Sequence, residues 1–308
     1  MLMTDLSGPI VDADQLAGDI LEPLVESAPI AFETAMSECA SADGMTGCQA
    51  YHAIWQYLRL TDVIRAVRVD GPLFAAAVKA QAARGPLRRI LISGTADYSM
   101  LAYLGHAARI AGASPAFDVI DRCATTLSMN EWYGARRGLD VRTVLTDVNA
   151  YRPTERYDLI CTHSFLYWAA GQQRSDLFRN WHDWLAPEGR LCFSNRIEPS
   201  SPLADTVSPS SRVQAMVSEF FRRRAELGIV LPVPDREFES LIRSYARRPA
   251  RRVRDLTMQR LQAHFDEVGL VAETAVKVAD VVPGHRDKIS APVQSEGRPR
   301  FWFQARRA

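Results

Sequence analysis

Short apolar runs that alternate with helical stretches constrain the fold of this chain more than any other feature. Between residues 87 and 198 the runs are RRILIS, FDVID, VRTVLTD, YDLICTH and RLCFSNR. Strands that are apolar on both faces lie inside parallel sheets, with helices covering both sides. Because crossover connections between parallel strands are right-handed, this pattern predicts an α/β fold with a doubly wound, mostly parallel sheet.

The rest of the sequence divides around this core. We expect an N-terminal helical region at 1–86, the α/β core at 87–198, an arginine-rich helical insertion at 199–254 and the end of the core at 255–308. The last region contains an amphipathic helix and two further runs, VAETAVKVADVV and RPRFWFQARR. These runs predict two more strands, which close a seven-stranded sheet with an antiparallel hairpin.

The composition favours a cytoplasmic globular protein. Of the 308 residues, 47% are hydrophobic and 24% are charged, and the formal net charge of +1 gives no reason to expect a polyanionic partner or a membrane surface. The first residues lack the pattern of a secretory signal, and no apolar run is as long as a membrane span. The cysteines form no CxxC pair, which indicates reduced thiols in the core. They are Cys39, Cys48, Cys123, Cys161 and Cys192.

The ends of the predicted strands carry the residues that can bind a ligand, because ligands of an open parallel sheet lie beyond the carboxyl ends of its strands. Asp121 closes the second run, 27 positions after Gly94. Its carboxylate can accept hydrogen bonds from both hydroxyls of a ribose over the first loop. Asp147 closes the third run, where it can accept an adenine amino group while Val148 packs against the ring.

This order of residues resembles the class I S-adenosylmethionine-dependent methyltransferases. The similarity covers residues 88–198 and 255–306, and the segments WHDWLAPEGRLCFS and LQAHFDEVGLVAETAVKV carry much of it. The resemblance implies S-adenosylmethionine as the cofactor and S-adenosylhomocysteine as the product. It places Gly94 against the methionine part, Asp121 at the ribose and Asp147 at the adenine. It also places His163, after the fourth run, opposite the sulfonium and the substrate.

The first loop departs from the family pattern. The family has an acid before the loop and three alternating glycines, whereas this chain has Ile92, Gly94, Ala96 and Tyr98 at those positions. Glycine lets the backbone approach a ligand closely, so Ala96 is a mild replacement and Tyr98 a bulky one. We therefore predict a rebuilt cofactor loop, in which Asp97 caps the following helix or takes over polar contacts of the missing acid.

His163 is the candidate catalytic residue. An imidazole at this position can act as a general base that deprotonates the acceptor before methyl transfer, or it can simply line the cofactor site. Other residues of the predicted cleft could contact the substrate or cover the site. These candidates are Tyr51, Trp55, Tyr167, Asn195 and Arg196.

Charged residues elsewhere give weaker signals. The run Arg222 to Arg224 and a second arginine group at 247–254 are typical of a solvated helix face, with binding of an anionic small molecule as the alternative. We do not expect nucleic acid as a partner, because no RNA-binding module accompanies the arginines. We also expect no metal site, since His182 and Asp183 adjoin without a third ligand at suitable spacing.

Together these features predict a methyltransferase for a small or medium-sized acceptor, which can be anionic. We expect no membrane partner, and sheet edges or the N-terminal lid could pair in a homodimer. Two alternatives stay open. The first is a protein of the same fold that catalyses a cyclisation or rearrangement, and the second is a non-enzymatic binding protein in which Tyr98 fills the methionine space. A nucleic-acid methyltransferase is less favoured.

Overall fold

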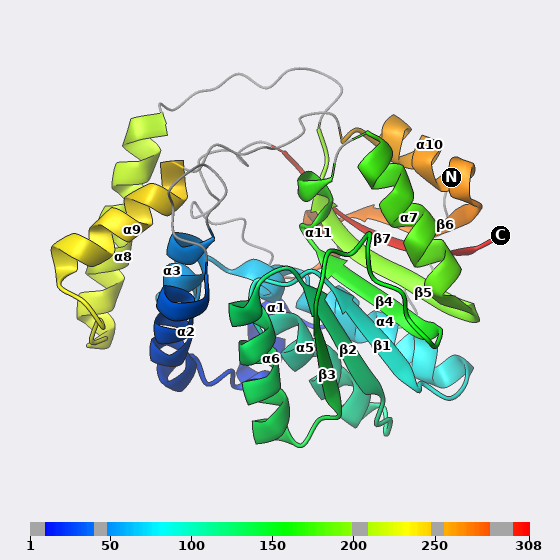
Figure 1. Cartoon of the computed structure of the whole chain (residues 1–308), viewed down its shortest axis with the longest axis horizontal. Helices are drawn as coiled ribbons and strands as arrows, with labels where there is room; N and C mark the ends of the chain where they lie inside the picture. The colour runs from blue at the N-terminus through cyan, green and yellow to red at the C-terminus, as the bar shows by residue number, and fades with distance from the viewer. Residues whose placement is uncertain (1–9, 40–47, 170, 199–208, 248–255, 284–297) are drawn as a thin grey trace.

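The chain is built around a mixed β-sheet (Figure 1). The computed structural model describes residues 10–39, 48–169, 171–198, 209–247, 256–283 and 298–308. Within these residues the strands are β1 (Arg89–Ser93), β2 (Ala116–Asp121), β3 (Val141–Leu145), β4 (Tyr157–His163), β5 (Leu185–Arg196), β6 (Leu270–Lys277) and β7 (Arg300–Arg307).

The order of the seven strands in the sheet is β3-β2-β1-β4-β5-β7-β6. The first five strands pair in parallel, and β7 is antiparallel to both of its neighbours, β5 and β6. This order, with one antiparallel strand, is typical of the Rossmann-like methyltransferase fold. The predicted fold class is therefore confirmed.

Helices cover both faces of the sheet. Ile90 and Ile92 of β1 pack in one apolar cluster with residues of α4 (Gly71–Arg84), α5 (Ser99–Ile110) and α6 (Ala124–Arg137). Leu91, which points to the opposite face, packs in a second cluster with α7 (Gln172–Trp184) and α10 (Met258–Val268). The period-two alternation along β1 thus explains why three successive residues, Ile90 to Ile92, are buried and apolar.

The N-terminal helices and the insertion share a third apolar cluster. It joins α2 (Leu24–Glu38) and α3 (Gln49–Leu60) to α8 (Pro209–Leu227) and α9 (Asp235–Arg247), which stand together on the left in Figure 1. A short helix, α1 (Ala13–Ile20), packs instead against the core cluster of α4 and α5. Segments far apart in the sequence therefore form one lobe beside the carboxyl ends of β2 and β3.

Some boundaries differ from the sequence-based expectation. The fifth strand begins before the run RLCFSNR, because Leu185 already pairs with Tyr157 of β4; the register then shifts, and regular pairing resumes at Arg190. The run VAETAVKVADVV ends as a strand at Lys277 and continues as α11 (Val278–Val281). Short 3-10 turns, η1 (Ala66–Val69) and η2 (Leu166–Trp168), complete the described elements. None of the described helices is both long and apolar enough to cross a membrane.

Candidate functional site

The first loop requires glycine at its start. Gly94 has a φ of +74°, which glycine adopts without steric cost, and its N–H donates to the carbonyl of Ile120 at 2.9 Å. A Cβ atom at this position would lie only 2.3 Å from the ring of Phe165. Phe165, which follows β4, therefore covers the backbone of the loop, a contact that the sequence analysis did not predict.

Tyr98 does not occupy the space over Gly94. Its side chain is fully buried and stacks on Tyr133 of α6, with ring centroids 4.6 Å apart, and its hydroxyl lies 2.9 Å from Ser27 of α2. The hypothesis that Tyr98 fills the methionine space is wrong, because the side chain points into the core between the helices. Ala96, in the loop between β1 and α5, is partly buried.

Asp97 faces the N-terminal helices. One carboxylate oxygen accepts the N–H of Ser99 at 2.9 Å, although the N-cap residue of α5 is Tyr98, and the other pairs with Arg59 of α3 at 2.5 Å. Arg59 also contacts both carboxylate oxygens of Glu22 at 2.6 Å. Burial raises the pKa of the Glu22 carboxyl, against the opposing effect of Arg59. Asp97 is only 1% exposed, so its contacts fasten the loop and do not face a ligand.

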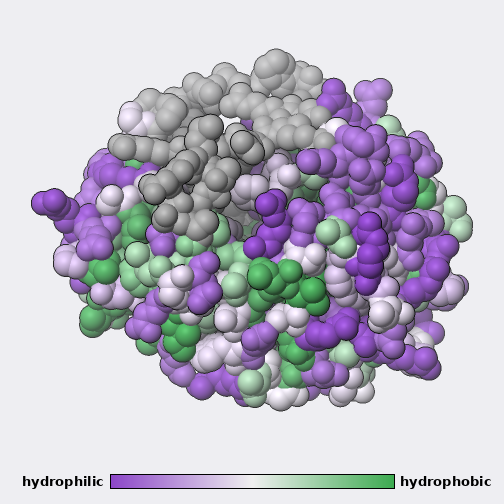
Figure 2. Space-filling model, in the orientation of Figure 1, coloured by the Kyte–Doolittle hydropathy of each residue, from purple (hydrophilic) through white to green (hydrophobic). Residues whose placement is uncertain are grey.

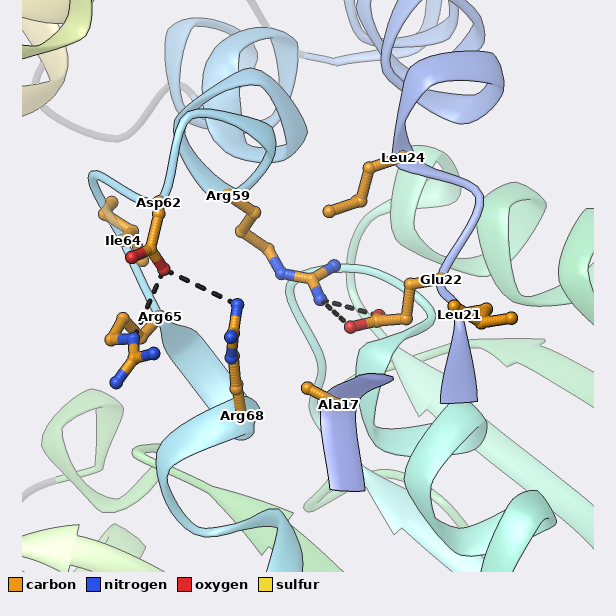
Figure 3. A pocket seen from close by; sticks show the side chains of 9 residues that line it. All are labelled: Ala17, Leu21, Glu22, Leu24, Arg59, Asp62, Ile64, Arg65 and Arg68. Carbon is orange, nitrogen blue, oxygen red and sulfur yellow. Dashed lines mark hydrogen bonds and ion pairs between the residues drawn. The ribbon is translucent and has the colours of Figure 1, made fainter. Parts of the chain in front are cut away.

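A pocket of about 250 Å³ lies beside this ion pair (Figure 3). Arg59 reaches across it toward Glu22, and on the far side Asp62 holds Arg65 and Arg68. Both of these arginines also pair with Asp14 of α1. The remaining lining residues are Ala17, Leu21, Leu24 and Ile64. The charges that line the pocket are thus paired with one another or with Asp14 and Asp97. These ion pairs connect the N-terminal helices to the first loop.

The two predicted acids lie at adjacent strand ends. Both oxygens of the Asp121 carboxylate accept a backbone N–H, one from Thr95 at 3.0 Å and one from Cys123 at 2.8 Å. Burial raises the pKa of Asp121, although these two N–H groups act in the opposite direction. The N–H of Thr146 donates to the Asp121 carbonyl at 2.9 Å, which brings the Asp147 segment beside it.

Asp147 is more open than Asp121. Its side chain is 46% exposed, accepts the N–H of Asn149 at 2.9 Å and lies 3.7 Å from the guanidinium of the exposed Arg122. Val148 is partly buried and packs against the second core cluster. The structure therefore brings Gly94, Asp121 and Asp147 to one edge of the sheet, as the strand-end argument predicts.

His163 belongs to a buried polar cluster that the sequence analysis did not foresee. Its Nε2 lies 2.8 Å from a carboxylate oxygen of Asp70, which precedes α4. Ser194 of β5 donates to the same oxygen. Arg300 of β7 lies 3.2 Å from that oxygen, 2.8 Å from the hydroxyl of Ser164 and 3.1 Å from His163. Side chains of three strands thus converge on one fully buried carboxylate.

The charges of this cluster keep His163 neutral near pH 7. Burial and then the Arg300 guanidinium lower the pKa of the imidazole, and the Asp70 carboxylate opposes them only in part. Burial also disfavours ionisation of Asp70, but Arg300 and the hydrogen bonds from His163 and Ser194 lower its pKa to about 2. We assign the His163 proton to Nε2, which donates to Asp70, because the ionised carboxylate can only accept a hydrogen bond. Arg300, which can only donate, then lies 3.1 Å from Nε2 as a neighbouring charge and does not donate to it. Nδ1 is then the nitrogen that can accept a proton.

The predicted substrate residues lie in two separate places. Tyr51 stacks on Tyr245 of α9 at 5.7 Å, and Trp55 lies edge-on to the same ring at 6.5 Å, so both join α3 to the insertion. Tyr167 donates its hydroxyl proton to the carbonyl of Arg196 at 2.7 Å. Asn195 is fully buried on β5, one residue from Ser194. The aromatic pair is thus a packing contact, whereas the second group adjoins the His163 cluster.

The arginines of the run Arg222 to Arg224 have acidic or backbone partners. Arg222 pairs with Glu219 and Glu226, and Arg224 pairs with Asp235. Arg223 donates to the carbonyl of Thr61 at 3.3 Å. The ion pairs fit a solvated face of α8, and Arg223 also contacts the end of α3. The second arginine group lies outside the described residues, except for the backbone of Arg247.

No family model and no curated protein matches the sequence. Solved structures do match, at low sequence identity. These structural neighbours are class I S-adenosylmethionine-dependent methyltransferases, together with a cyclase.

One neighbour is an S-adenosylmethionine-dependent methyltransferase from Clostridium acetobutylicum, which is 9% identical and has a TM-score of 0.49 over 82% of this chain and 96% of that chain. Another is the N-methyltransferase NodS from Bradyrhizobium japonicum in complex with S-adenosylhomocysteine, which is 14% identical with a TM-score of 0.42 over 93% of this chain and 99% of that chain. The cyclase SpnF is 12% identical and has a TM-score of 0.49 over 97% of each chain. The likeness concerns the fold.

Proposed function

We propose that this chain is an S-adenosylmethionine-dependent methyltransferase that acts on a small or medium-sized acceptor, which can be anionic. One observation carries the proposal. The partly buried Asp121 carboxylate ends β2, and the N–H of Thr95 from the first loop holds it at 3.0 Å. A carboxylate fixed in this way between two strand ends can receive the ribose hydroxyls of a nucleoside that lies across the edge.

The residues at this edge fit the nucleoside part of the cofactor. Each oxygen of Asp121 accepts one backbone N–H, so a second lone pair on each oxygen can accept a hydroxyl. Asp147 lies at the neighbouring strand end with nearly half of its side chain exposed, where it can accept an amino group. The bound cofactor would supply an electrophilic methyl group, so the chain itself has to orient the acceptor, exclude water and remove a proton.

His163 is the residue that we expect to remove this proton. Its Nε2–H is held by Asp70, and its neutral Nδ1 can accept a proton from a hydroxyl, an amine or an acidic carbon. Asp70 acts as a positioning residue, because it fixes the ring orientation and stabilises the imidazolium that forms. Arg300 supplies a nearby positive charge, and a carboxylated or phosphorylated acceptor would suit that charge.

A second candidate function rests on Phe165. Because its ring lies against Gly94, it occupies space that the methionine part of the cofactor would need. This contact favours a protein of the same fold that binds a ligand at the Asp121 edge without methyl transfer, either as a cyclisation or rearrangement enzyme or as a binding protein. The two candidates differ in methyl transfer. Within the second, a cyclisation or rearrangement enzyme can keep S-adenosylmethionine, whereas a binding protein with Phe165 in the methionine space does not bind it.

Calorimetric titration with S-adenosylmethionine and S-adenosylhomocysteine, with ATP as the control ligand, tests the proposal. We expect both cofactors to bind and ATP not to bind. Asp121→Asn should weaken binding by about 10- to 100-fold, because a hydrogen bond to a charged group contributes about 1.5–3 kcal/mol. Asp147→Asn should weaken it less, since this side chain is more exposed.

Asp183→Asn, an exposed carboxylate on α7, is the matched control and should keep full affinity. Unchanged affinity in both the Asp121 and Asp147 variants would overturn the site assignment. If neither cofactor binds the wild-type protein, the second candidate replaces the first. If both bind but no acceptor is methylated in a screen of small acids, alcohols and amines, the cyclisation or rearrangement enzyme is favoured.

A further inference from the structure

Three cysteines and a histidine from distant parts of the sequence meet beside the Asp121 loop. Cys39 directly follows α2, Cys48 and His52 lie at the start of α3, and Cys123 directly precedes α6. The three sulfur atoms and one ring nitrogen all lie within 4.8 Å of one another. The sequence analysis expected scattered core thiols; all five are free, but three of them converge here.

The distances within the group approach those of a tetrahedral metal centre. The Sγ atom of Cys123 lies 3.4 Å from that of Cys39 and 3.7 Å from that of Cys48. His52 Nδ1 lies 3.3 Å from the Cys39 sulfur and 3.1 Å from the Cys123 sulfur. Bond lengths to zinc of about 2.3 Å for sulfur and about 2.0–2.1 Å for nitrogen place neighbouring tetrahedral ligands about 3.6–3.8 Å apart. An outward shift of a few tenths of an ångström would therefore admit the ion.

The set of donor atoms selects the kind of ion. Thiolate sulfur and imidazole nitrogen are the ligands that zinc takes in structural sites, whereas magnesium and calcium take oxygen. A disulfide is a poorer description of the group, because a bonded sulfur pair is about 2.05 Å apart and here two sulfur atoms lie at similar distances from the third.

We propose that Cys39, Cys48, His52 and Cys123 bind one zinc ion. Four protein ligands complete a tetrahedral shell, which is typical of structural zinc and leaves no position for a substrate. The surroundings support the ligands: the hydroxyl of Thr125 lies 3.0 Å from the Cys39 sulfur, and Tyr51 packs against the His52 ring at 4.7 Å. Cys39, His52 and Cys123 are each less than 10% exposed.

The site joins the N-terminal helices to the α/β core. Cys39, Cys48 and His52 all belong to the α2–α3 segment, whereas Cys123 belongs to the loop between β2 and α6. Because no other described part of the chain belongs to this group, the ion acts as a cross-link between these two segments. This assignment does not depend on the proposed methyl transfer.

Measurement of metal content on the full-length protein tests the assignment. After expression with zinc in the medium and purification without chelators, we expect about one zinc ion per chain. X-ray absorption at the zinc edge should show three sulfur ligands at about 2.3 Å and one nitrogen ligand at about 2.0–2.1 Å. This experiment uses the wild-type protein, so it does not depend on whether any variant folds.

Variants then identify the ligands. Cys39→Ser and Cys123→Ser should lose most of the zinc, whereas Cys161→Ala, which changes a buried cysteine outside the group, should keep it. Substitution by cobalt(II) should give the absorption bands of a tetrahedral thiolate centre in the wild type. A metal-free wild-type protein after growth with zinc would overturn the proposal. A Cys39–Cys123 or Cys48–Cys123 disulfide that mass spectra detect in protein purified with a mild reductant would also overturn it. Equal zinc content in all variants would also overturn it.

Discussion

At the scale of single residues, Phe165 controls how much room the first loop offers. Its ring lies so close to Gly94 that even a methyl group would not fit between them. Any ligand that approaches the Gly94 backbone must displace this ring. The apparent affinity is then the affinity of the open loop multiplied by the fraction of molecules in which the ring has moved away.

Phe165→Ala should therefore raise the affinity for S-adenosylhomocysteine, by about threefold to tenfold, because the variant no longer has to open the loop. Calorimetric titration measures this change. Phe221→Ala, at a partly buried position on α8, is the control and should leave the affinity unchanged. A lower affinity in the Phe165 variant would mean that the ring packs against the bound ligand and does not exclude it.

At the scale of secondary-structure elements, local sequence patterns predicted most of the sheet. Strand β1 could be recognised because Leu91 packs on one face and Ile92 on the other, so the centre of the run is apolar without alternation. The start of β5 could not be predicted, because Leu185 is a strand residue only through its pairing with Tyr157 of β4. Such pairing depends on the tertiary structure and leaves no periodic signal in the sequence.

The candidate site, like the sheet, could be predicted only where the signal is local in the sequence. The strand-end argument located Asp121, Asp147 and His163 because each closes an apolar run. It could not find Asp70, which precedes α4 and reaches His163 only after the chain has folded. An aspartate before Gly-Pro at a helix start was the only local signal. Arg300 was equally hidden, because it begins the last strand and meets His163 only through the antiparallel pairing of β7 with β5.

Asp70 links the start of α4 to three strands, so its ionisation should stabilise the fold. Its pKa is about 2 in the folded chain against a usual value of 3.8, so the unfolded chain binds more protons between these values. The stabilisation of about 2 kcal/mol is complete above about pH 4 and is lost as the pH falls toward 2. Asp70→Asn should lower the free energy of unfolding at neutral pH by at least this amount and flatten its dependence on pH below 4.

Urea unfolding between pH 2.5 and 7 measures this effect. Asp183→Asn serves as the control, because its carboxylate is exposed on α7 and should change neither the stability nor its pH dependence by more than a few tenths of a kcal/mol. An Asp70 variant with the same acid dependence as the wild type would show that the carboxylate is not the group that titrates in this range.

At the scale of the whole molecule, the N-terminal helices contact the edge of the sheet at which we place the cofactor at two points. Arg59 of α3 binds Asp97 in the first loop, and His52 of the same helix lies 3.1 Å from Cys123 in the loop between β2 and α6. The Cys123 N–H in turn donates to Asp121 at 2.8 Å. A zinc ion at the cysteine cluster would therefore fix the carboxylate that we assign to the ribose, although no zinc ligand would touch the cofactor.

Removal of zinc should consequently weaken cofactor binding. We expect dialysis against a strong chelator to lower the affinity for S-adenosylhomocysteine by about tenfold and the addition of zinc to restore it. By linkage, S-adenosylhomocysteine should raise the equilibrium affinity for zinc by the same factor, which competition with the chelator measures. The Cys161→Ala variant should respond as the wild type does. Zinc that is present but removed without effect on affinity would contradict this coupling alone, because metal content and cofactor binding are each measured separately.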